Sequence, residues 1–340
     1  MTRRAVIFGC AGTEINDDER RFFAETKPAG FILFARNCQT PDQVRILTAS
    51  LRDSISWDQA PVLIDQEGGR VARLGPPHWP RRPPAQKFAA LARQEDLVVA
   101  CEAARANARL IAADLRALGI TVNCAPVLDI PVPGAHKIIG DRAHGADPKT
   151  IAILGRAVCE GLLAGGVLPV IKHIPGHGRA TTDSHVELPV VGTALEKMRK
   201  TDFAPFVALR DMTCAMAPHV LYSELDATAP ATSSPRIIQE VIRDDIGFNG
   251  LLLSDDIGME ALSGTVGERS AAILAAGCDI VLECSGDIKV MRAVAETVLP
   301  LTTAASNRLE RALGNIGPPK IFDPVKTTAR LTALIGARTV

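Results

Sequence analysis

The chain has 340 residues, and its 38 lysines and arginines are balanced by 38 aspartates and glutamates. A formal charge of zero argues against nucleic acid as the main partner, because domains that bind phosphate backbones carry a clear basic excess. Aromatic residues make up only 4% of the chain, which leaves few rings for stacking on bases or for anchoring at a membrane surface. We therefore expect a small-molecule partner, with no nucleic acid and no membrane involved.

The cysteines and the N-terminal segment indicate a cytoplasmic protein. The eight cysteines are scattered without CxxC pairs, as is usual for reduced thiols in the cytosol. Arg3 and Arg4 precede an apolar run at 5–10, but this run is shorter than the roughly seven to fifteen apolar residues of an export signal. No apolar segment approaches the roughly 18 residues of a membrane span.

Short runs that are apolar throughout recur along the chain, and each is followed by a turn and then by a helical pattern. Such runs are typical of strands that are buried on both faces of a parallel sheet. The predicted strands are 5–8, 31–34, 61–64, 122–125, 167–171, 214–217, 251–254 and 279–282.

Helices are predicted between these strands. Thr40-Pro41, Asp147-Pro148 and Ser234-Pro235 each place an N-cap residue before a proline, which is a common way to begin a helix. The predicted helices are 41–54, 88–118, 148–165, 235 to about 247, 266–276 and 287–298.

Eight strands alternating with helices predict an α/β fold of the (β/α)₈ TIM-barrel type, and an open doubly wound sheet is the alternative. The barrel is favoured because polar residues follow the strands, where the active sites of such barrels lie. No linker or low-complexity tract divides the chain, so we expect residues 1–340 to form a single catalytic domain with a helical tail after about residue 300. The polar residues after the strands are Asp65, Gln66, Glu67, Asp129, Lys172, His173, His219, Asp255 and Asp256.

Residues 172–189, KHIPGHGRATTDSHVELP, concentrate three histidines in one glycine-bearing segment: His173, His177 and His185. Histidine is the side chain whose unperturbed pKa lies nearest neutrality. Asp183 stands two residues before His185, and a carboxylate bonded to one imidazole nitrogen orients the other for proton transfer. The segment therefore predicts acid/base chemistry, whereas a solvated loop whose histidines cap nearby helices is the alternative.

A metal site is a competing interpretation, with the three histidines and Asp183 as ligands. A barrel metallohydrolase typically has an H-x-H pair after its first strand, and Phe8-Gly9-Cys10 stands there instead. We expect neither a metal nor a cofactor.

Asp255 and Asp256 end the seventh strand. Side chains alternate across a strand, so only one of the two is expected to face the barrel axis. Asp255 is the candidate nucleophile, although a base or a metal ligand is also consistent with its position. Asp256 better fits the N-cap of the next helix.

The segment 65–74, DQEGGRVARL, places two acids beside a Gly-Gly turn and two arginines, Arg70 and Arg73. Acids and arginines at a pocket mouth suit a ligand that is rich in hydroxyl and amide groups. A surface turn with an ion pair is the alternative. Arg142 follows the fourth strand and has the same two interpretations.

These motifs together resemble the single-domain bacterial β-N-acetylhexosaminidases of glycoside hydrolase family 3. The KHxPGHG motif, the DSH motif that follows it and the later SDD motif form the most specific part of the resemblance. The matching segments, in the order of the family, are 30–37, 63–74, 123–130, 139–145, 172–189 and 251–260.

The resemblance implies a retaining exo-enzyme that removes terminal, non-reducing β-linked N-acetylglucosamine from peptidoglycan fragments during recycling. The substrate would be a muropeptide, N-acetylglucosaminyl-1,6-anhydro-N-acetylmuramic acid with or without its stem peptide. It also implies that Asp255 forms a covalent glycosyl-enzyme and that His185, supported by Asp183, is the acid/base. The residues that would bind the sugar are Asp65, Arg73, Arg142, Lys172 and His173.

Two other functions stay open at this point. The first is a β-glucosidase or another glycosidase of the same fold. Relatives of that kind with two domains take their acid/base from the second domain, whereas this chain carries its own DSH motif. The second is a non-catalytic sugar-binding protein, against which the intact Asp255, Asp183 and His185 argue.

Overall fold

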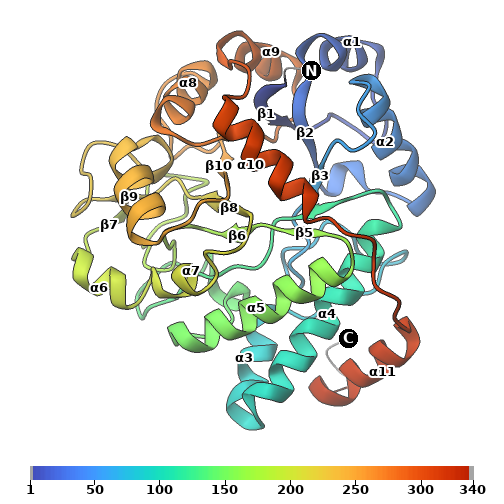
Figure 1. Ribbon diagram of the computed structural model, residues 1–340, viewed down its shortest axis with the longest axis vertical. Helices are drawn as coiled ribbons and strands as arrows, with labels where there is room; N and C mark the ends of the chain where they lie inside the picture. The colour runs from blue at the N-terminus through green and yellow to red at the C-terminus, as the bar shows by residue number, and fades with distance from the viewer. Residues whose placement is uncertain (1–2, 337–340) are drawn as a thin grey trace.

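The computed structural model describes residues 3–336 and contains a closed parallel barrel surrounded by helices (Figure 1). The sheet order is β5-β4-β3-β2-β1-β11-β10-β8-β6. Since only Val170 separates β5 from β6, both ends of the sheet belong to one segment and the sheet closes on itself. The strands are β1 (Arg4–Phe8), β2 (Pro28–Leu33), β3 (Val62–Ile64), β4 (Val122–Asn123), β5 (Leu168–Pro169), β6 (Ile171–Lys172), β8 (Cys214–Ala217), β10 (Leu251–Asp256) and β11 (Ile280–Glu283). The predicted barrel and its eight strand segments are confirmed, and the open sheet is wrong.

Alternate residues of the strands enter two different apolar clusters. In β1, Ile7 packs inside the barrel, whereas Val6 and Phe8 pack against the surrounding helices. In β3, Leu63 points inward while its neighbours pack outward. Both faces are therefore apolar, which explains why the strand segments show no alternation of polar and apolar residues.

The helix starts that were read from N-cap and proline pairs are present. Thr40 accepts a hydrogen bond from the Gln43 amide at the start of α2, and Asp147 accepts one from the Thr150 amide at the start of α5. The helices up to residue 297 are α1 (Asp17–Thr26), α2 (Pro41–Ser54), α3 (Ala85–Gln94), α4 (Leu97–Arg116), α5 (Pro148–Ala164), α6 (Leu195–Lys200), α7 (Ala204–Ala208), the π-helix η4 (Ile237–Asp245), α8 (Val266–Ala276) and α9 (Ile288–Thr297). No helix within residues 3–336 is long and apolar enough to cross a membrane.

One predicted helix differs from the structure, and helices α1, α6 and α7 were not predicted. The single helix predicted at 88–118 is two helices, because Asp96 accepts a hydrogen bond from the Val98 amide and begins a new helix. Helix α1 was not predicted, although Asn16 and Glu19 form a capping box at its start, a signal that is visible in the sequence.

The segment after residue 300 contains α10 (Thr303–Gly314) and α11 (Pro324–Ile335). Helix α10, red in Figure 1, crosses one end of the barrel, and its Leu309 and Ala312 join the interior apolar cluster. Asn315 donates a hydrogen bond to Thr213, just before β8, so this is the N-terminal end of the strands. The C-terminal ends of the strands remain open on the opposite side.

Candidate active site

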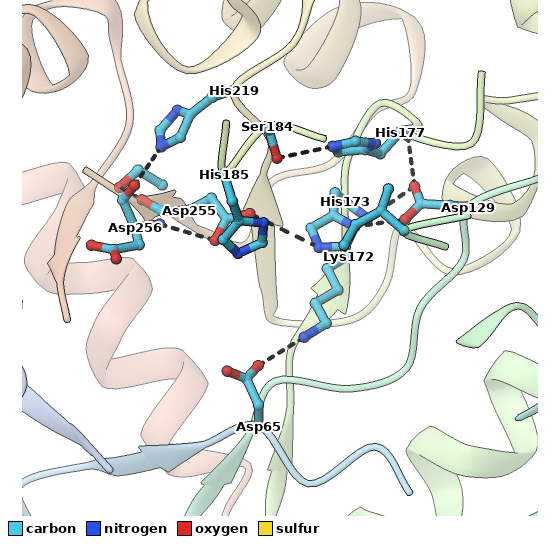
Figure 2. A network of polar contacts seen from close by, with 12 residues as sticks. Asp65, Asp129, Lys172, His173, His177, Ser184, His185, His219, Asp255 and Asp256 are labelled. Carbon is cyan, nitrogen blue, oxygen red and sulfur yellow. Dashed lines mark hydrogen bonds and ion pairs between the residues drawn. The ribbon is translucent and has the colours of Figure 1, made fainter. Parts of the chain in front are cut away.

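A cavity of about 330 Å³ lies at the C-terminal ends of the barrel strands. Of the eight residues predicted for the site, Asp183 is the one outside the cavity lining, and it is bonded to a residue that lines it. The barrel topology therefore brings together side chains that are far apart in sequence, as Figure 2 shows. The predicted residues that line the cavity are Asp65, Arg73, Arg142, Lys172, His173, His185 and Asp255.

One wall of the cavity is a cluster of paired charges, named here the charge cluster: Asp65, Glu67, Arg73, Arg142 and Lys172. The Lys172 ammonium lies 2.8 Å from Asp65 Oδ1 and 2.7 Å from Glu67 Oε1. Arg142 donates two hydrogen bonds to the Glu67 carboxylate, at 2.8 and 2.9 Å. Arg73 donates one to Asp65 at 3.1 Å. Glu67 thus joins two predicted sugar-binding cations, a role that its sequence position alone does not reveal.

The groups of the charge cluster hold one another in their charged forms. Burial raises the pKa of Glu67, but Lys172 and Arg142 outweigh that effect and lower this pKa to about 2. The pKa of Asp65 is likewise lowered far below its usual range, because Lys172 and Arg73 outweigh burial. Burial lowers the pKa of Lys172, yet the two carboxylates raise it overall. The wall therefore presents fixed donors and acceptors that suit sugar hydroxyls at neutral pH.

His173 is fixed by the fully buried Asp129. Its Nδ1 lies 2.6 Å from Asp129 Oδ2, and its backbone amide donates to Oδ1 at 3.2 Å. Burial raises the pKa of Asp129, but His173 outweighs burial and lowers this pKa to about 2. The other ring nitrogen of His173 lies 4.0 Å from Asp255 Oδ2. Asp129 thus orients His173 toward Asp255, although the sequence placed it only as a polar residue after the fourth strand.

Asp255 lies at the end of β10, where its Oδ1 accepts a hydrogen bond of 2.9 Å from the Asp256 amide. Burial raises the pKa of Asp255, but several neighbouring groups, with His173 first among them, together outweigh burial, so this pKa lies below its usual range. The carboxylate is therefore ionised at neutral pH and lines the cavity beside the charge cluster.

Asp256 corrects two expectations. It also lines the cavity, because the β10–β11 register shifts between Leu253 and Asp256 and interrupts simple alternation. It does not cap the next helix, since Thr265 caps α8. Instead, its carboxylate accepts hydrogen bonds from the amides of Gly258 and Cys284. Burial, with the neighbouring negative charge of Asp255, raises the pKa of Asp256.

His219, which follows β8, supports the end of β10 from behind. Its Nδ1 lies 2.8 Å from Thr232 Oγ1, and its Nε2 lies 2.9 Å from the Asp256 carbonyl oxygen. The side chain is fully buried, and burial lowers its pKa. His219 is therefore neutral at pH 7 and braces the strand that carries Asp255.

Asp183 and His185 are paired, although their spacing of two residues is unfavourable in regular structure. Asp183 Oδ1 lies 2.7 Å from His185 Nδ1 and also accepts the His185 backbone amide at 2.9 Å. Burial raises the pKa of Asp183, but these hydrogen bonds outweigh it and lower this pKa. Since Asp183 engages Nδ1, the Nε2 of His185 is left for a ligand in the cavity.

The histidine side chains of residues 172–189 have different hydrogen-bond partners, although the rings of His173 and His177 lie with their centroids 5.5 Å apart. His173 is bonded to Asp129, His185 to Asp183, and His177 Nε2 lies 3.3 Å from Ser184 Oγ. Among residues 3–336, no group of three or more His, Cys, Asp or Glu side chains is arranged to hold a metal ion.

Comparisons with known proteins agree with this geometry. Residues 5–315 match the model of the glycosyl hydrolase family 3 N-terminal domain. A β-hexosaminidase of Thiobacillus denitrificans is 36% identical over 97% of this chain and 92% of its own length. One from Bordetella pertussis is 38% identical over 83% of this chain and 80% of its own length.

The fold comparison gives the same result. The structure of NagZ from Neisseria gonorrhoeae in complex with N-trifluoroacetyl-D-glucosamine superposes with a TM-score of 0.89 at 30% sequence identity, covering 99% of both chains. A glycoside hydrolase family 3 β-N-acetylglucosaminidase from a Paenibacillus species superposes with a TM-score of 0.83 at 29% identity, over 97% of this chain and 66% of that one. The chain therefore belongs to glycosyl hydrolase family 3 and is a glycoside hydrolase.

Proposed function

We propose that this enzyme is a retaining exo-β-N-acetylglucosaminidase that acts on peptidoglycan fragments. The observation that carries the proposal is that an ionised carboxylate, Asp255, and an imidazole oriented by a carboxylate, His185, line the same cavity. The β-hexosaminidase relatives and the N-trifluoroacetyl-D-glucosamine complex of NagZ support an N-acetylglucosamine substrate.

The reaction proceeds in two steps. Asp255 attacks the anomeric carbon while His185 donates a proton to the glycosidic oxygen, so the C1–O bond breaks and an ester to Asp255 forms. His185 then takes a proton from water, the water oxygen attacks the anomeric carbon, and Asp255 leaves as a carboxylate. Two displacements give net retention of configuration.

An imidazole is a reasonable acid/base next to this nucleophile. Retaining glycosidases usually pair two carboxyl groups, and a second carboxylate would be repelled by Asp255. A protonated His185 is attracted to Asp255 instead, because opposite charges stabilise each other's charged forms. Asp183 adds a negative charge that stabilises the imidazolium and fixes its ring.

The charge cluster and His173 would hold the hydroxyl groups and the acetamide of the terminal sugar. We propose the muropeptide N-acetylglucosaminyl-1,6-anhydro-N-acetylmuramic acid, with or without its stem peptide, as substrate, with no metal or cofactor. The eight free cysteines support a reducing compartment and hence a cytoplasmic reaction.

The first test compares 4-nitrophenyl β-N-acetylglucosaminide with the corresponding β-glucoside. We expect a much higher kcat/KM for the N-acetylglucosaminide, and faster cleavage of the glucoside would favour a β-glucosidase instead. Binding without cleavage of either substrate would indicate a sugar-binding protein. The natural disaccharide is then compared with chitobiose, and a preference for chitobiose would contradict the peptidoglycan assignment.

The second test identifies the nucleophile. A 5-fluoro glycoside of N-acetylglucosamine should label the enzyme covalently, and mass spectrometry of peptides should place the label on Asp255. A label on Glu67 or Asp256 would overturn the residue assignment.

A further inference from the structure

We propose that His177 is a positioning residue that sets the place of the acid/base pair through Ser184. The proposal rests on the proposed function, because it concerns the loop that carries Asp183 and His185. This loop, residues 181–188, is named here the catalytic loop.

Ser184 is the residue that fastens the catalytic loop to the barrel. It is the one buried residue of 181–188, and it stands directly between Asp183 and His185. Its Oγ lies 3.3 Å from His177 Nε2, and its carbonyl oxygen accepts a hydrogen bond of 3.3 Å from the Ala261 amide. Both acid/base residues are therefore held from a single point between them.

The backbone around His177 is itself held by two fully buried side chains. Its backbone amide donates to Asp129 Oδ1 at 2.7 Å, and the Tyr222 hydroxyl donates to the carbonyl oxygen of the preceding Gly176 at 2.8 Å. Asp129 also fixes His173, which faces the nucleophile. Asp129 therefore fixes both His177 and the histidine that faces Asp255. Figure 2 shows the contacts that lead from Asp129 to His177 and from His177 to Ser184.

The glycine that follows His177 adds to this rigidity. A Cβ at Gly178 would lie 2.1 Å from the carbonyl oxygen of Ile130, so close packing of two backbone segments requires glycine here. The backbone at Gly178 is therefore held against Ile130 and does not act as a free hinge for the catalytic loop.

Within residues 3–336, the ring of His177 makes one hydrogen bond, to the Ser184 hydroxyl. Burial lowers the pKa of His177 to about 4, with His173 as a further cause, so the ring is neutral at pH 7. The Nδ1 atom is buried without a hydrogen-bond partner in that part of the chain. A buried nitrogen without a hydrogen-bond partner destabilises the folded protein, so an apolar side chain would suit this position better if packing were its only role. The hydrogen bond to Ser184 explains why an imidazole is present instead.

Loss of the His177–Ser184 hydrogen bond is expected to slow proton transfer and to leave sugar binding unchanged. Without the His177–Ser184 bond, Asp183 and His185 still pair with each other, but their distance from the scissile oxygen is no longer fixed. Proton donation then suffers, because a general acid acts only within hydrogen-bond reach. The charge cluster makes no bond to Ser184, so sugar affinity is expected to persist.

The test uses Ser184→Ala, with Thr182→Ala as the matched control. Thr182 lies in the same loop, and its buried hydroxyl has no hydrogen-bond partner within residues 3–336. For a substrate with a poor leaving group, we expect Ser184→Ala to lower kcat/KM about tenfold, the worth of one hydrogen bond. For the 4-nitrophenyl glycoside, which needs little proton donation, the loss should stay below about twofold. The Kd for N-acetylglucosamine and all constants of Thr182→Ala should match the unmodified enzyme.

Two further variants separate positioning from mere packing. His177→Phe should repeat the Ser184→Ala pattern, and His177→Gln, whose amide can either donate to or accept from the Ser184 hydroxyl, should restore part of the rate. The double variant His177→Phe/Ser184→Ala should have the same kcat/KM as His177→Phe, because the two substitutions remove the same hydrogen bond. If His177→Phe fails to fold, the Ser184→Ala comparison still decides.

Equal kinetics for Ser184→Ala and Thr182→Ala would overturn the proposal, as would equal losses for both leaving groups. An unmodified enzyme that cleaves no N-acetylglucosaminide would overturn the proposed function and this inference together. Failure of the positioning role alone leaves the activity of the unmodified enzyme intact, so the two failures are distinguishable.

Discussion

Lys172 and His185 line the same cavity but are held in opposite ways. The Lys172 side chain is 3% exposed and bridges two carboxylates, whereas the His185 side chain is 58% exposed and bonded to a residue of its own loop. The charge cluster joins Lys172 of β6 to side chains that follow β3 and β4. The catalytic loop is attached mainly at Ser184.

This difference assigns two tasks to two kinds of structure. In the proposed function, sugar recognition needs several groups held at fixed distances, which buried ion pairs at the ends of the strands provide. In the proposed function, proton transfer to a departing group and later from water is carried out by His185, which lies on an exposed loop fastened to the rest of the protein at Ser184. Substitutions in the two regions should therefore separate stability from catalysis.

The largest effect is expected at the nucleophile. Asp255→Ala should lower kcat by at least about 10⁴-fold for every substrate, since the covalent step has no substitute. Steady-state kinetics and calorimetric binding of N-acetylglucosamine measure rate and affinity separately, and binding should remain detectable. Asp256→Asn is the neighbouring control, and a larger loss in that variant would contradict the assignment.

The next effect concerns the exposed acid/base. His185→Ala should lower kcat/KM for poor leaving groups by about 10²- to 10⁴-fold, the usual worth of a general acid. The ratio kcat/KM reports the first chemical step, so activated aryl glycosides should lose far less. Equal losses for both kinds of substrate would argue against an acid role.

A third substitution tests the buried region by stability instead of rate. Lys172→Met leaves Asp65 and Glu67 without their shared cation, and breaking such a buried network should lower the free energy of unfolding by about 3 to 5 kcal/mol. Urea unfolding followed by circular dichroism measures the change. His185→Ala should stay within about 0.5 kcal/mol of the unmodified enzyme, and similar losses in both variants would remove the proposed contrast.

The smallest effect is a pH dependence of stability. The folded-state pKa of Glu67 is lowered to about 2, so its contribution is present above the unfolded pKa of about 4.5 and is lost as pH falls toward 2. Between pH 7 and pH 3, the enzyme should therefore lose about 2 kcal/mol more unfolding free energy than Glu67→Gln does. Parallel urea titrations at the two pH values provide the measurement, and equal acid sensitivity would show that Glu67 is not held ionised.

The barrel could be predicted because its strands are apolar on both faces and its helices begin with recognisable caps. The break between α3 and α4 was missed because Ala, Leu and Arg continue on both sides of it, and only Asp96 marks the new start. The missed helix α1 shows the reverse case, since a capping box is present at Asn16 but no long apolar period follows it.

In the site, the shared cavity of the predicted residues could be anticipated because several of them follow the ends of strands, whereas their predicted roles come from the family resemblance. Their partners were harder to find. Nothing local marks Glu67 as the link between Lys172 and Arg142, because that contact joins three separate segments of the chain. The cavity-facing position of Asp256 depends on a register shift, which strand alternation does not reveal.

Helix α10 determines where the C-terminal part of the chain can be shortened or extended. Because Leu309 and Ala312 complete the apolar column inside the barrel, a shortened protein that ends near residue 300 would expose that column to water and favour aggregation. Beyond α10 the chain runs over the surface to α11, which packs on α4. Fusion partners and affinity tags are therefore better attached after α11 than in place of α10.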